Sequence, residues 1–204
     1  MKTLVVDRST SLMSVAWLEE EKIIAKDEFH ELTSHGAEPI VFLKEFMARQ
    51  GGADGADQII VGTGPGSFAG IRTVLSFAQG YALGKTCEVK GLSSAYALGA
   101  GKTTVIGDAR RGLYWVARFT DYQLESPIQT YAWDNLPQVV GTDSEIVTVD
   151  EERIGEKLAA QFGAQYVGGR NPTAEGLACA FLAHPEVLVN EPLPFYLCPA
   201  VRVS

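Results

Sequence analysis

Short apolar runs alternate with polar turns at the start of the chain, which is the pattern of antiparallel β-strands. Three runs rich in apolar and β-branched residues occupy positions 4–7, 12–18 and 22–29. The links between them, at 8–10 and 19–21, are short enough for hairpins. The pattern therefore predicts an antiparallel meander of three strands.

After the meander, the apolar spacing becomes helical and then alternates between strand and helix. Helical spacing covers residues 36–50, 67–84 and 93–100, whereas short buried strands are predicted at 58–61 and 87–90. A succession of strands and helices after a meander is typical of an α/β fold with a mixed sheet. We expect that fold class here.

The second half of the chain repeats the opening pattern more weakly. Residues 104–108 and 113–119 form another predicted strand pair across a turn at 109–112. Further strands are predicted at 145–149 and 166–167, and further helices at 151–162 and 173–182. Two strand-pair openings predict a duplicated fold in two lobes, residues 1–102 and 103–204, of which the second is the more degenerate.

The most distinctive segment lies at residues 62–72, which read Gly-Thr-Gly-Pro-Gly-Ser-Phe-Ala-Gly-Ile-Arg. Glycine lets the backbone turn left-handed or approach another group closely, and proline fixes one backbone angle. Such a segment makes either a tight packing point or a cradle for an anion. We call it the glycine loop, and the residues that define it are Gly62, Gly64, Pro65, Gly66, Ser67 and Gly70.

Neither of the two common phosphate-binding motifs fits this part of the chain. A dinucleotide fingerprint would need a glycine where Ser67 stands. The triplet Gly101-Lys102-Thr103 lacks the first glycine of a P-loop, because Tyr96 occupies that position. Ser67 can still cap the following helix, whose free N–H groups could hold an anion. A plain capped turn is the more common arrangement, and both alternatives stay open.

The helix after the glycine loop has an unusual outer side. At 100° per residue, its core side is predicted to carry Phe68, Ile71, Val74, Leu75, Ala78, Tyr81 and Ala82. The opposite side holds Ala69, Arg72, Thr73, Ser76, Gln79 and Gly80. Arg72 is the only charged residue in the sequence from 63 to 84. A solvated helix face usually carries several charges, so we expect this side to be covered.

The preceding helix, over residues 36–50, shows a similar excess of apolar side chains. Its core stripe is predicted to hold Ala37, Ile40, Val41, Leu43, Met47 and Ala48. Phe42 and Phe46 lie off that stripe, one turn apart, which indicates a second buried surface. That surface is either a partner interface, which we favour, or a face covered by the second lobe.

Composition limits the classes of partner. The net charge is −8, from 17 Lys plus Arg against 25 Asp plus Glu, so the chain is poorly suited to hold nucleic acid by itself. Three cysteines, Cys87, Cys179 and Cys198, show no metal-binding spacing and are expected to be free thiols in a reducing cytoplasm. No apolar run reaches the roughly 20 residues that span a bilayer, and the strand-like start does not resemble a signal peptide. We expect a cytoplasmic protein.

The histidines and nucleophiles predict no catalytic centre. His30 and His35 are five residues apart, a spacing that does not align two imidazoles on one helical face as a metal pair, and His184 stands alone. No Gly-x-Ser-x-Gly nucleophile motif is present in the sequence. We therefore expect no catalytic residue, metal site or cofactor.

Four charged residues near strand ends deserve separate consideration. Asp7 and Asp108 end equivalent strands of the two lobes, which is either an acid pair facing a cleft or, more commonly, a pair of hairpin-capping side chains. Arg110 and Arg111 occupy a hairpin turn beside Trp115. They form either a small anion or RNA contact or an ordinary solvated turn, and the turn is the more common case.

Five blocks of sequence, in order, resemble one known family. They are the segments 6–10, 35–39, 62–72, 107–115 and 194–197, with Val-Asp-Arg-Ser-Thr, Gly-Pro-Gly-Ser-Phe-Ala-Gly-Ile-Arg and Gly-Asp-Ala-Arg-Arg-Gly among them. The chain thereby resembles the bacterial TsaB (YeaZ) family of tRNA threonylcarbamoyladenosine biosynthesis proteins. It departs from the family pattern at Arg8, Gly36, Ala69 and Cys198.

The resemblance implies an actin-like, ribonuclease-H-like fold in two lobes with mixed sheets. It implies a non-catalytic subunit that pairs with the catalytic paralogue TsaD and the ATPase TsaE, forms a homodimer when alone, and meets tRNA only indirectly. In that family the two helices after the meander and the glycine loop build the pairing surface. A stand-alone glycoprotease-like hydrolase or nucleotide hydrolase on the same fold is the alternative.

Overall fold

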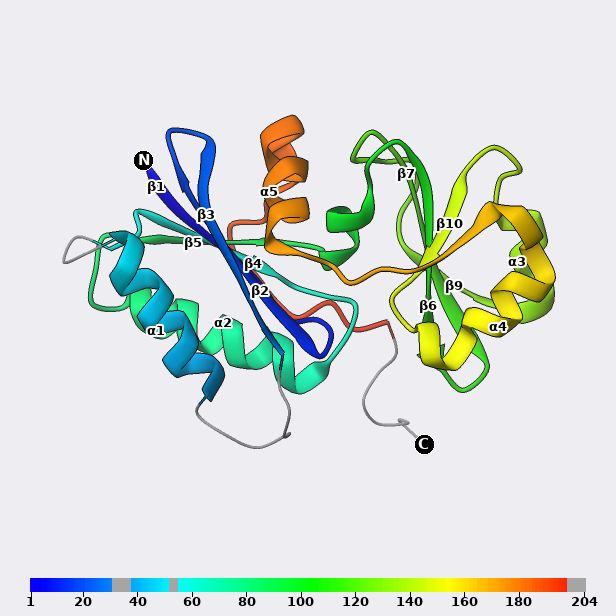
Figure 1. Cartoon of the computed structure of the whole chain (residues 1–204), viewed down its shortest axis with the longest axis horizontal. Coiled ribbons are helices and arrows are strands. Elements are labelled where there is room, and N and C mark those ends of the chain that lie inside the picture. The colour runs from blue at the N-terminus through cyan, green and yellow to red at the C-terminus, as the bar shows by residue number, and fades with distance from the viewer. Residues whose placement is uncertain (31–37, 52–54, 198–204) are drawn as a thin grey trace. The chain divides into compact units, whose positions relative to one another are not determined.

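The computed structural model describes residues 1–30, 38–51 and 55–197, which form two compact units (Figure 1). Unit 1 comprises Met1–Ala97 and Pro172–Phe195, and unit 2 comprises Leu98–Asn171 with the segment from Tyr196. The first division lies close to the one expected at residue 102. Residues Pro172–Phe195 belong to unit 1 rather than to the second lobe in which they were expected, because the helix that follows Pro172 packs on the sheet of unit 1.

Unit 1 is built on a five-stranded mixed sheet, as the sequence predicts. The strands are β1 (Lys2–Asp7), β2 (Leu12–Glu19), β3 (Lys22–His30), β4 (Gln58–Gly62) and β5 (Glu88–Leu92). Their order in the sheet is β3-β2-β1-β4-β5. The first three strands pair antiparallel, and β1, β4 and β5 pair parallel. The predicted meander is confirmed.

Helices cover both faces of this sheet. Helices α1 (Glu38–Gly51) and α2 (Phe68–Ala82) lie on one face, and α5 (Ala174–Ala183) lies on the other (Figure 1). The segment predicted as a helix over 93–100 is a short 3-10 helix, Ser94–Leu98, and another follows α5 at Pro185–Val187. The predicted start of α1 at Gly36 falls outside the described residues.

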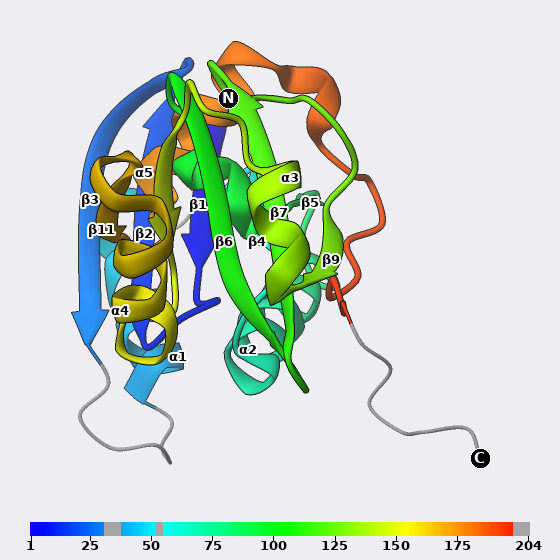
Figure 2. The same ribbon diagram turned by 90° about the vertical axis from the view of Figure 1, so that its right-hand side faces the viewer.

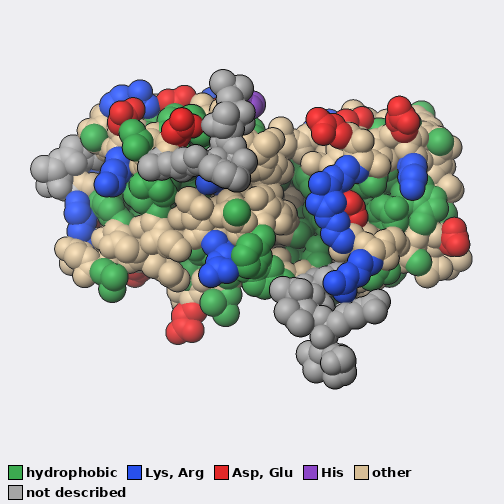
Figure 3. Space-filling model, turned by 90° about the horizontal axis from the view of Figure 1, so that it is seen from below, with side chains coloured by type: hydrophobic (Ala, Val, Ile, Leu, Met, Phe, Trp, Pro, Cys, Tyr) green, Lys and Arg blue, Asp and Glu red, His purple; other side chains and the backbone are tan. Residues whose placement is uncertain are grey.

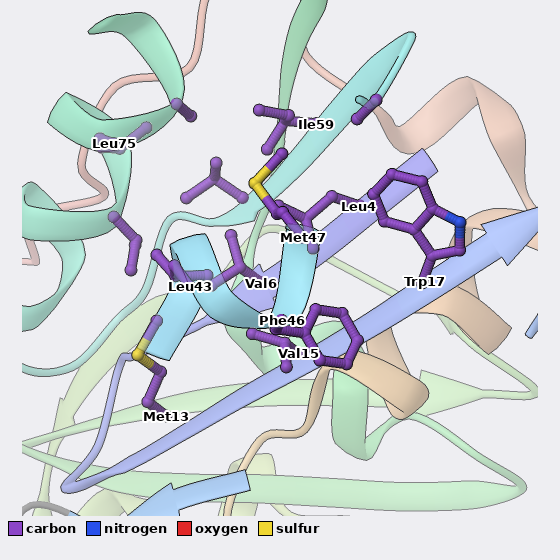
Figure 4. Close-up of a cluster of buried hydrophobic side chains, with 14 of the residues drawn as sticks. Leu4, Val6, Met13, Val15, Trp17, Leu43, Phe46, Met47, Ile59 and Leu75 are labelled. Atoms are coloured by element: carbon purple, nitrogen blue, oxygen red, sulfur yellow. The ribbon is translucent and has the colours of Figure 1, made fainter. Parts of the chain in front are cut away.

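The core of unit 1 corrects the predicted register of α1. Phe46 is only 1% exposed and points into the core with Leu43 and Met47 (Figure 4). Val41, which was expected in the core, is 48% exposed. The larger apolar area of the phenylalanine ring favours burying Phe46 over Val41. Phe46 is therefore a core residue rather than part of a partner surface.

Phe42 also differs from the expectation, though less strongly. Its ring is half-buried and lies 5.4 Å, between centroids, from the ring of Phe29 in β3. The aromatic pair packs against the core of unit 1 at its edge, next to the antiparallel strands. Only part of Phe42 is therefore available to a partner.

Unit 2 repeats the arrangement of unit 1 around a second sheet. Its strands are β6 (Lys102–Arg110), β7 (Leu113–Thr120), β8 (Gln123–Leu124), β9 (Gln129–Ala132), β10 (Glu145–Thr148) and β11 (Tyr166–Gly169). The order is β11-β10-β6-β7-β8, with β9 also pairing β7. Two helices, α3 (Leu136–Val139) and α4 (Glu151–Phe162), pack on one face of it (Figure 2). Short 3-10 helices occupy Trp133–Asn135 and Gly163–Gln165.

The strand connections of the two units match. In unit 2, β6 runs antiparallel to β7 and parallel to β10, which runs parallel to β11. In unit 1, β1 has the same relation to β2, β4 and β5. The α/β fold with two mixed sheets is thus confirmed. Among the described residues, no helix is both long enough and apolar enough to cross a membrane.

Candidate functional site

The glycine loop connects β4 to α2 and packs directly against the β1–β2 hairpin. A Cβ atom at Gly66 would collide with the carbonyl oxygen of Ser9, and one at Gly70 would collide with that of Arg8. The two glycines are therefore required by the close approach of two backbone segments. The loop is a packing point between the hairpin and the first turn of α2.

The N-terminus of α2 is capped from within the chain. The hydroxyl oxygen of Ser67 accepts a hydrogen bond from the Gly70 N–H at 3.2 Å, so the predicted cap is confirmed. The Ser67 N–H donates to the carbonyl oxygen of Ser9 at 2.6 Å. The hairpin thus occupies the space in front of the helix where an anion would otherwise bind, and packing is the alternative that the geometry supports.

The buried carboxylate of Asp7 holds the glycine loop through hydrogen bonds. Asp7 is fully buried at the end of β1, and its Oδ1 accepts from the N–H and the hydroxyl of Ser9 at 2.8 and 2.7 Å. Its Oδ2 accepts from the Ser94 hydroxyl at 2.5 Å. Ser94 in turn accepts from the Gly64 N–H at 3.0 Å and donates its own N–H to the Gly64 carbonyl at 2.7 Å. Asp7 therefore ties together the hairpin, the glycine loop and the chain after β5.

The electrostatics of Asp7 follow from this enclosure. Burial raises the pKa of the Asp7 carboxyl above its ordinary value, and the hydrogen bonds from Ser94 and Ser9 act in the opposite direction. Both carboxylate oxygens are occupied by protein donors. The structure therefore gives Asp7 the hairpin-capping role rather than that of an acid facing a cleft.

The equivalent aspartate of unit 2 has different surroundings. The Asp108 N–H donates to the Asp150 carboxylate at 2.8 Å, and the Asp108 side chain pairs with Arg110 at 3.4 Å and with Arg153 at 3.3 Å. Burial raises the pKa of Asp150, and the bond from the Asp108 N–H opposes that change. Arg111 is exposed, and no described residue pairs with it. Asp108 thus holds one of the two predicted turn arginines in place.

The outer face of α2 is open in this chain. Five of the six residues predicted to face outward are exposed and Thr73 is half-buried; the exposed ones are Ala69, Arg72, Ser76, Gln79 and Gly80. Phe68, expected in the core, is 50% exposed and lies under the guanidinium of Arg72, 4.9 Å from ring centroid to Cζ. Leu83, just after the helix, is 91% exposed. We call these eight residues the α2 face.

Small residues form a straight row along the α2 face. Ala69, Thr73, Ser76 and Gly80 follow one another at helical spacings of three or four residues. A Cβ atom at Gly80 would meet nothing within 4 Å. A glycine inside an exposed helix costs about 1 kcal/mol relative to alanine, and no contact within the described chain requires it. The row lets the backbone of another helix come close.

The surface around α2 supports the same interpretation. The side of unit 1 that carries α1 and α2 shows mainly hydrophobic and uncharged side chains, with charged groups scattered between them (Figure 3). Helix α1 contributes four charged residues, Glu38, Lys44, Glu45 and Arg49, whereas α2 contributes only Arg72. In the sequence, this face was indicated by the presence of only one charged residue, Arg72, from 63 to 84.

The position of the extended segment 189–195 could not be predicted from the sequence. Its backbone runs along the sheet edge, where Gly91 and Val189 exchange hydrogen bonds at 2.8 and 2.9 Å. The Phe195 N–H then donates to the Thr63 carbonyl at 2.8 Å, beside the glycine loop. Leu193 is 75% exposed there. The prolines of this segment indicated extended backbone but not its neighbours.

Within the described residues, no group of three or more His, Cys, Asp or Glu side chains is arranged to hold a metal ion. His35 and Cys198 lie outside the described residues. Cys87 and Cys179 are free thiols, as expected.

Comparison with known proteins identifies relatives of this chain. Residues 35–181 match the family model described as TsaD, tRNA N6-adenosine threonylcarbamoyltransferase. An uncharacterized protein of Mycobacterium leprae is 41% identical over 69 residues, which are 32% of this chain and 19% of that protein. An uncharacterized protein of Mycobacterium tuberculosis is 41% identical over 69 residues, 32% of each chain. The matched region thus spans a third or less of these relatives.

Solved structures share the fold over the full length. An uncharacterized Pseudomonas aeruginosa protein with similarity to peptidase YeaZ superposes with a TM-score of 0.76 at 21% identity, covering 97% of this chain and 99% of that chain. YeaZ from Pseudomonas aeruginosa gives a TM-score of 0.73 at 21% identity, covering 96% and 99%. The ethanolamine utilization protein EutJ of Carboxydothermus hydrogenoformans gives 0.55 at 11% identity, covering 88% and 89%. At these identities the likeness shows the fold alone.

Proposed function

The chain belongs to the family of TsaD, tRNA N6-adenosine threonylcarbamoyltransferase, and we propose that it is a non-catalytic scaffold subunit of a tRNA-modifying complex. That complex adds threonylcarbamoyl to N6 of adenosine 37 in tRNAs that decode ANN codons. The catalytic subunit is a TsaD-like paralogue of this chain. A TsaE-like ATPase joins the assembly.

The α2 face is the single observation that carries this proposal. It combines exposed apolar side chains, Phe68 and Leu83, with a row of small residues and one charge. A helix of the paralogue can dock on such a row with close backbone contact, and the apolar side chains at its ends add buried area. Phe42 of α1 is half-buried against Phe29 of β3, and its exposed part offers a partner a further contact outside the α2 face. A second copy of the chain uses the same face when the paralogue is absent.

The interior of the glycine loop supports a scaffold rather than a hydrolase. Actin-like enzymes need open donors and carboxylates for phosphate chemistry, whereas here Ser9 fills the space before α2 and both oxygens of Asp7 are bound inside the protein. These contacts favour a loop that sets the position of α2. The net charge of −8 supports tRNA binding through the complex rather than by this chain alone.

The proposal is tested by blocking the α2 face without disturbing the fold. Gly80→Arg introduces a long charged side chain where space is open, and it replaces a residue that disfavours helix. We expect co-purification with the TsaD paralogue to weaken by at least about tenfold, because the small-residue row is closed and a charge is buried without a partner.

The matched control is Ala159→Arg, a small-to-arginine change at an exposed position of α4 in unit 2. It should leave co-purification unchanged. Full pairing of both variants would exclude the α2 face as the docking surface.

A further inference from the structure

Arg72 is the one charged residue of the α2 face, and the described chain gives its charge no partner. It is exposed, and it forms no ion pair or hydrogen bond with a described residue. The Arg72 guanidinium lies over the Phe68 ring, with Cζ 4.9 Å from the ring centroid. Other arginines of the described chain pair with carboxylates, namely Arg49, Arg110, Arg118, Arg153 and Arg170.

Arg72 lies inside the α2 face rather than at its rim. At about 100° per residue, Phe68 and Thr73 bound an arc of about 140° on α2, and Arg72 lies about 40° inside the Phe68 edge. Ala69, three residues before Arg72, and Ser76, four residues after it, are its neighbours on the helix surface. A helix docked on the small-residue row therefore brings the Arg72 guanidinium into the interface.

The segments around Arg72 supply no carboxylate. Residues 8–11 and 63–84, which form the β1–β2 turn, the glycine loop and α2, contain arginine but neither Asp nor Glu. The first turn of α2 carries no acidic residue, although a helix N-terminus favours negative charge. Arg8 packs against this turn, where a Cβ atom at Gly70 would lie 3.2 Å from the Cγ of Arg8. These segments therefore make a positive region at the N-terminal end of the α2 face.

We propose that the docking helix of the TsaD-like paralogue carries an Asp or Glu side chain that pairs with Arg72. This inference rests on the proposed docking of the paralogue on the α2 face and names the chemistry of the partner there. A charge taken out of water without a partner destabilises a complex, whereas a guanidinium and a carboxylate join through two parallel hydrogen bonds. The contact with Phe68 restricts the guanidinium beforehand, so little side-chain freedom is lost when the pair forms.

The charge pair gives the docking helix a register that the small-residue row does not specify. Ala69, Thr73, Ser76 and Gly80 offer similar contacts at each turn, so a helix displaced by one turn, about 5.4 Å, meets them almost as well. Arg72 lies in the first half of α2, and the second half carries no charge. A carboxylate opposite Arg72 therefore selects one position and one direction of the docking helix, as a single polar residue does in coiled coils.

The same reasoning ranks the paralogue above a second copy of the chain as the occupant of the α2 face. The α2 face contains no Asp or Glu, so two copies joined through these faces present arginine to each other and no carboxylate. A homodimer formed through α2 therefore leaves both Arg72 charges without a partner on the facing helix. The heterodimer should accordingly be the tighter complex, and added paralogue should convert the homodimer into it.

Surface plasmon resonance with the full chain and the purified TsaD-like paralogue tests the charge pair. Arg72→Gln should raise the Kd at least about thirtyfold, mainly through faster dissociation, because the partner's carboxylate is left buried and unpaired. Arg72→Lys keeps the charge but loses the two parallel donors, so its Kd should lie between those of Arg72→Gln and the unmodified chain. The matched control is Arg111→Gln, which removes another exposed arginine without a described partner and should leave the Kd unchanged.

Charge exchange completes the test. Arg72→Glu should abolish pairing, and replacement of one Asp or Glu of the paralogue by Arg should restore it. An unchanged Kd for Arg72→Gln, an effect confined to the association rate, or failure of every such replacement to restore pairing would overturn the inference. Gly80→Arg separates this inference from the proposed function: if Gly80→Arg blocks pairing and Arg72→Gln does not, the α2 face remains the docking surface and only the charge pair is refuted.

Discussion

At the scale of single residues, Asp7 shows how a candidate catalytic group can serve the fold. In sequence it is a carboxylate at a strand end, and Asp108 has the equivalent place in unit 2. In the structure, Asp7 accepts hydrogen bonds from Ser9 and Ser94, and Ser94 holds Gly64. The carboxylate thereby links β1 to the start of α2, and through it to the surface that we propose for pairing.

Burial of Asp7 predicts a specific dependence of stability on pH. Because its folded-state pKa is raised, the folded protein binds more protons than the unfolded chain between the ordinary pKa and the raised one. The contribution of Asp7 to the free energy of unfolding therefore falls as pH rises through that window. It should be most favourable at the acid end.

Urea unfolding of the unmodified chain and of Asp7→Asn at several values between about pH 4 and pH 7 measures this contribution, since asparagine does not titrate. The free energy of unfolding of the unmodified chain, relative to that of the variant, should decrease as pH rises. A difference that grows with pH would mean that hydrogen bonding outweighs burial at this site.

At the scale of elements, the outer and inner faces of α1 and α2 decide what is available to a partner. Five of the six residues predicted on the outer side of α2 are exposed, because a face with a single charge is visible in any helical projection, whereas the exposure of Phe68 was not predicted. It misplaced the α1 stripe, because Val41 and Phe46 are both apolar and only packing chooses between them. The larger phenylalanine ring of Phe46 occupies the core, and Val41 is left exposed.

The corrected register of α1 makes a stability prediction. Phe46→Ala should lower the free energy of unfolding by about 3–5 kcal/mol, because it opens a cavity in the core of unit 1. Val41→Ala, on the same helix but 48% exposed, should change it by less than about 0.5 kcal/mol. Chemical denaturation of both variants gives the comparison. Similar losses for the two would restore the register predicted from sequence.

At the scale of the whole molecule, the two units share one pattern of strand pairing but differ in their helices and in the surroundings of their equivalent aspartates. Unit 1 buries Asp7 and presents α2, in which Arg72 is the only charged residue, whereas the helix between β9 and β10 in unit 2, α3, has only four residues. The duplication was visible in sequence, because strand pairs and their turns recur in order. The return of α5 to unit 1 was not, since nothing local tells a helix which sheet it covers.

In the candidate site, contacts between neighbouring residues could be predicted from the sequence, whereas contacts between distant residues could not. The Ser67 cap follows from neighbouring residues and was predicted. The contacts of Asp7 with Ser94 and of Phe195 with Thr63 join residues far apart in sequence, so only the fold reveals them.

The central claim is that α2 docks on a TsaD-like paralogue, and amide hydrogen exchange of the chain alone and in the presence of that paralogue tests it most directly. Backbone amides of Phe68–Ala82 should exchange more slowly in the complex, while those of Glu151–Phe162 in α4 keep their rates. Unchanged exchange in α2, with protection elsewhere on the chain, would contradict the claim.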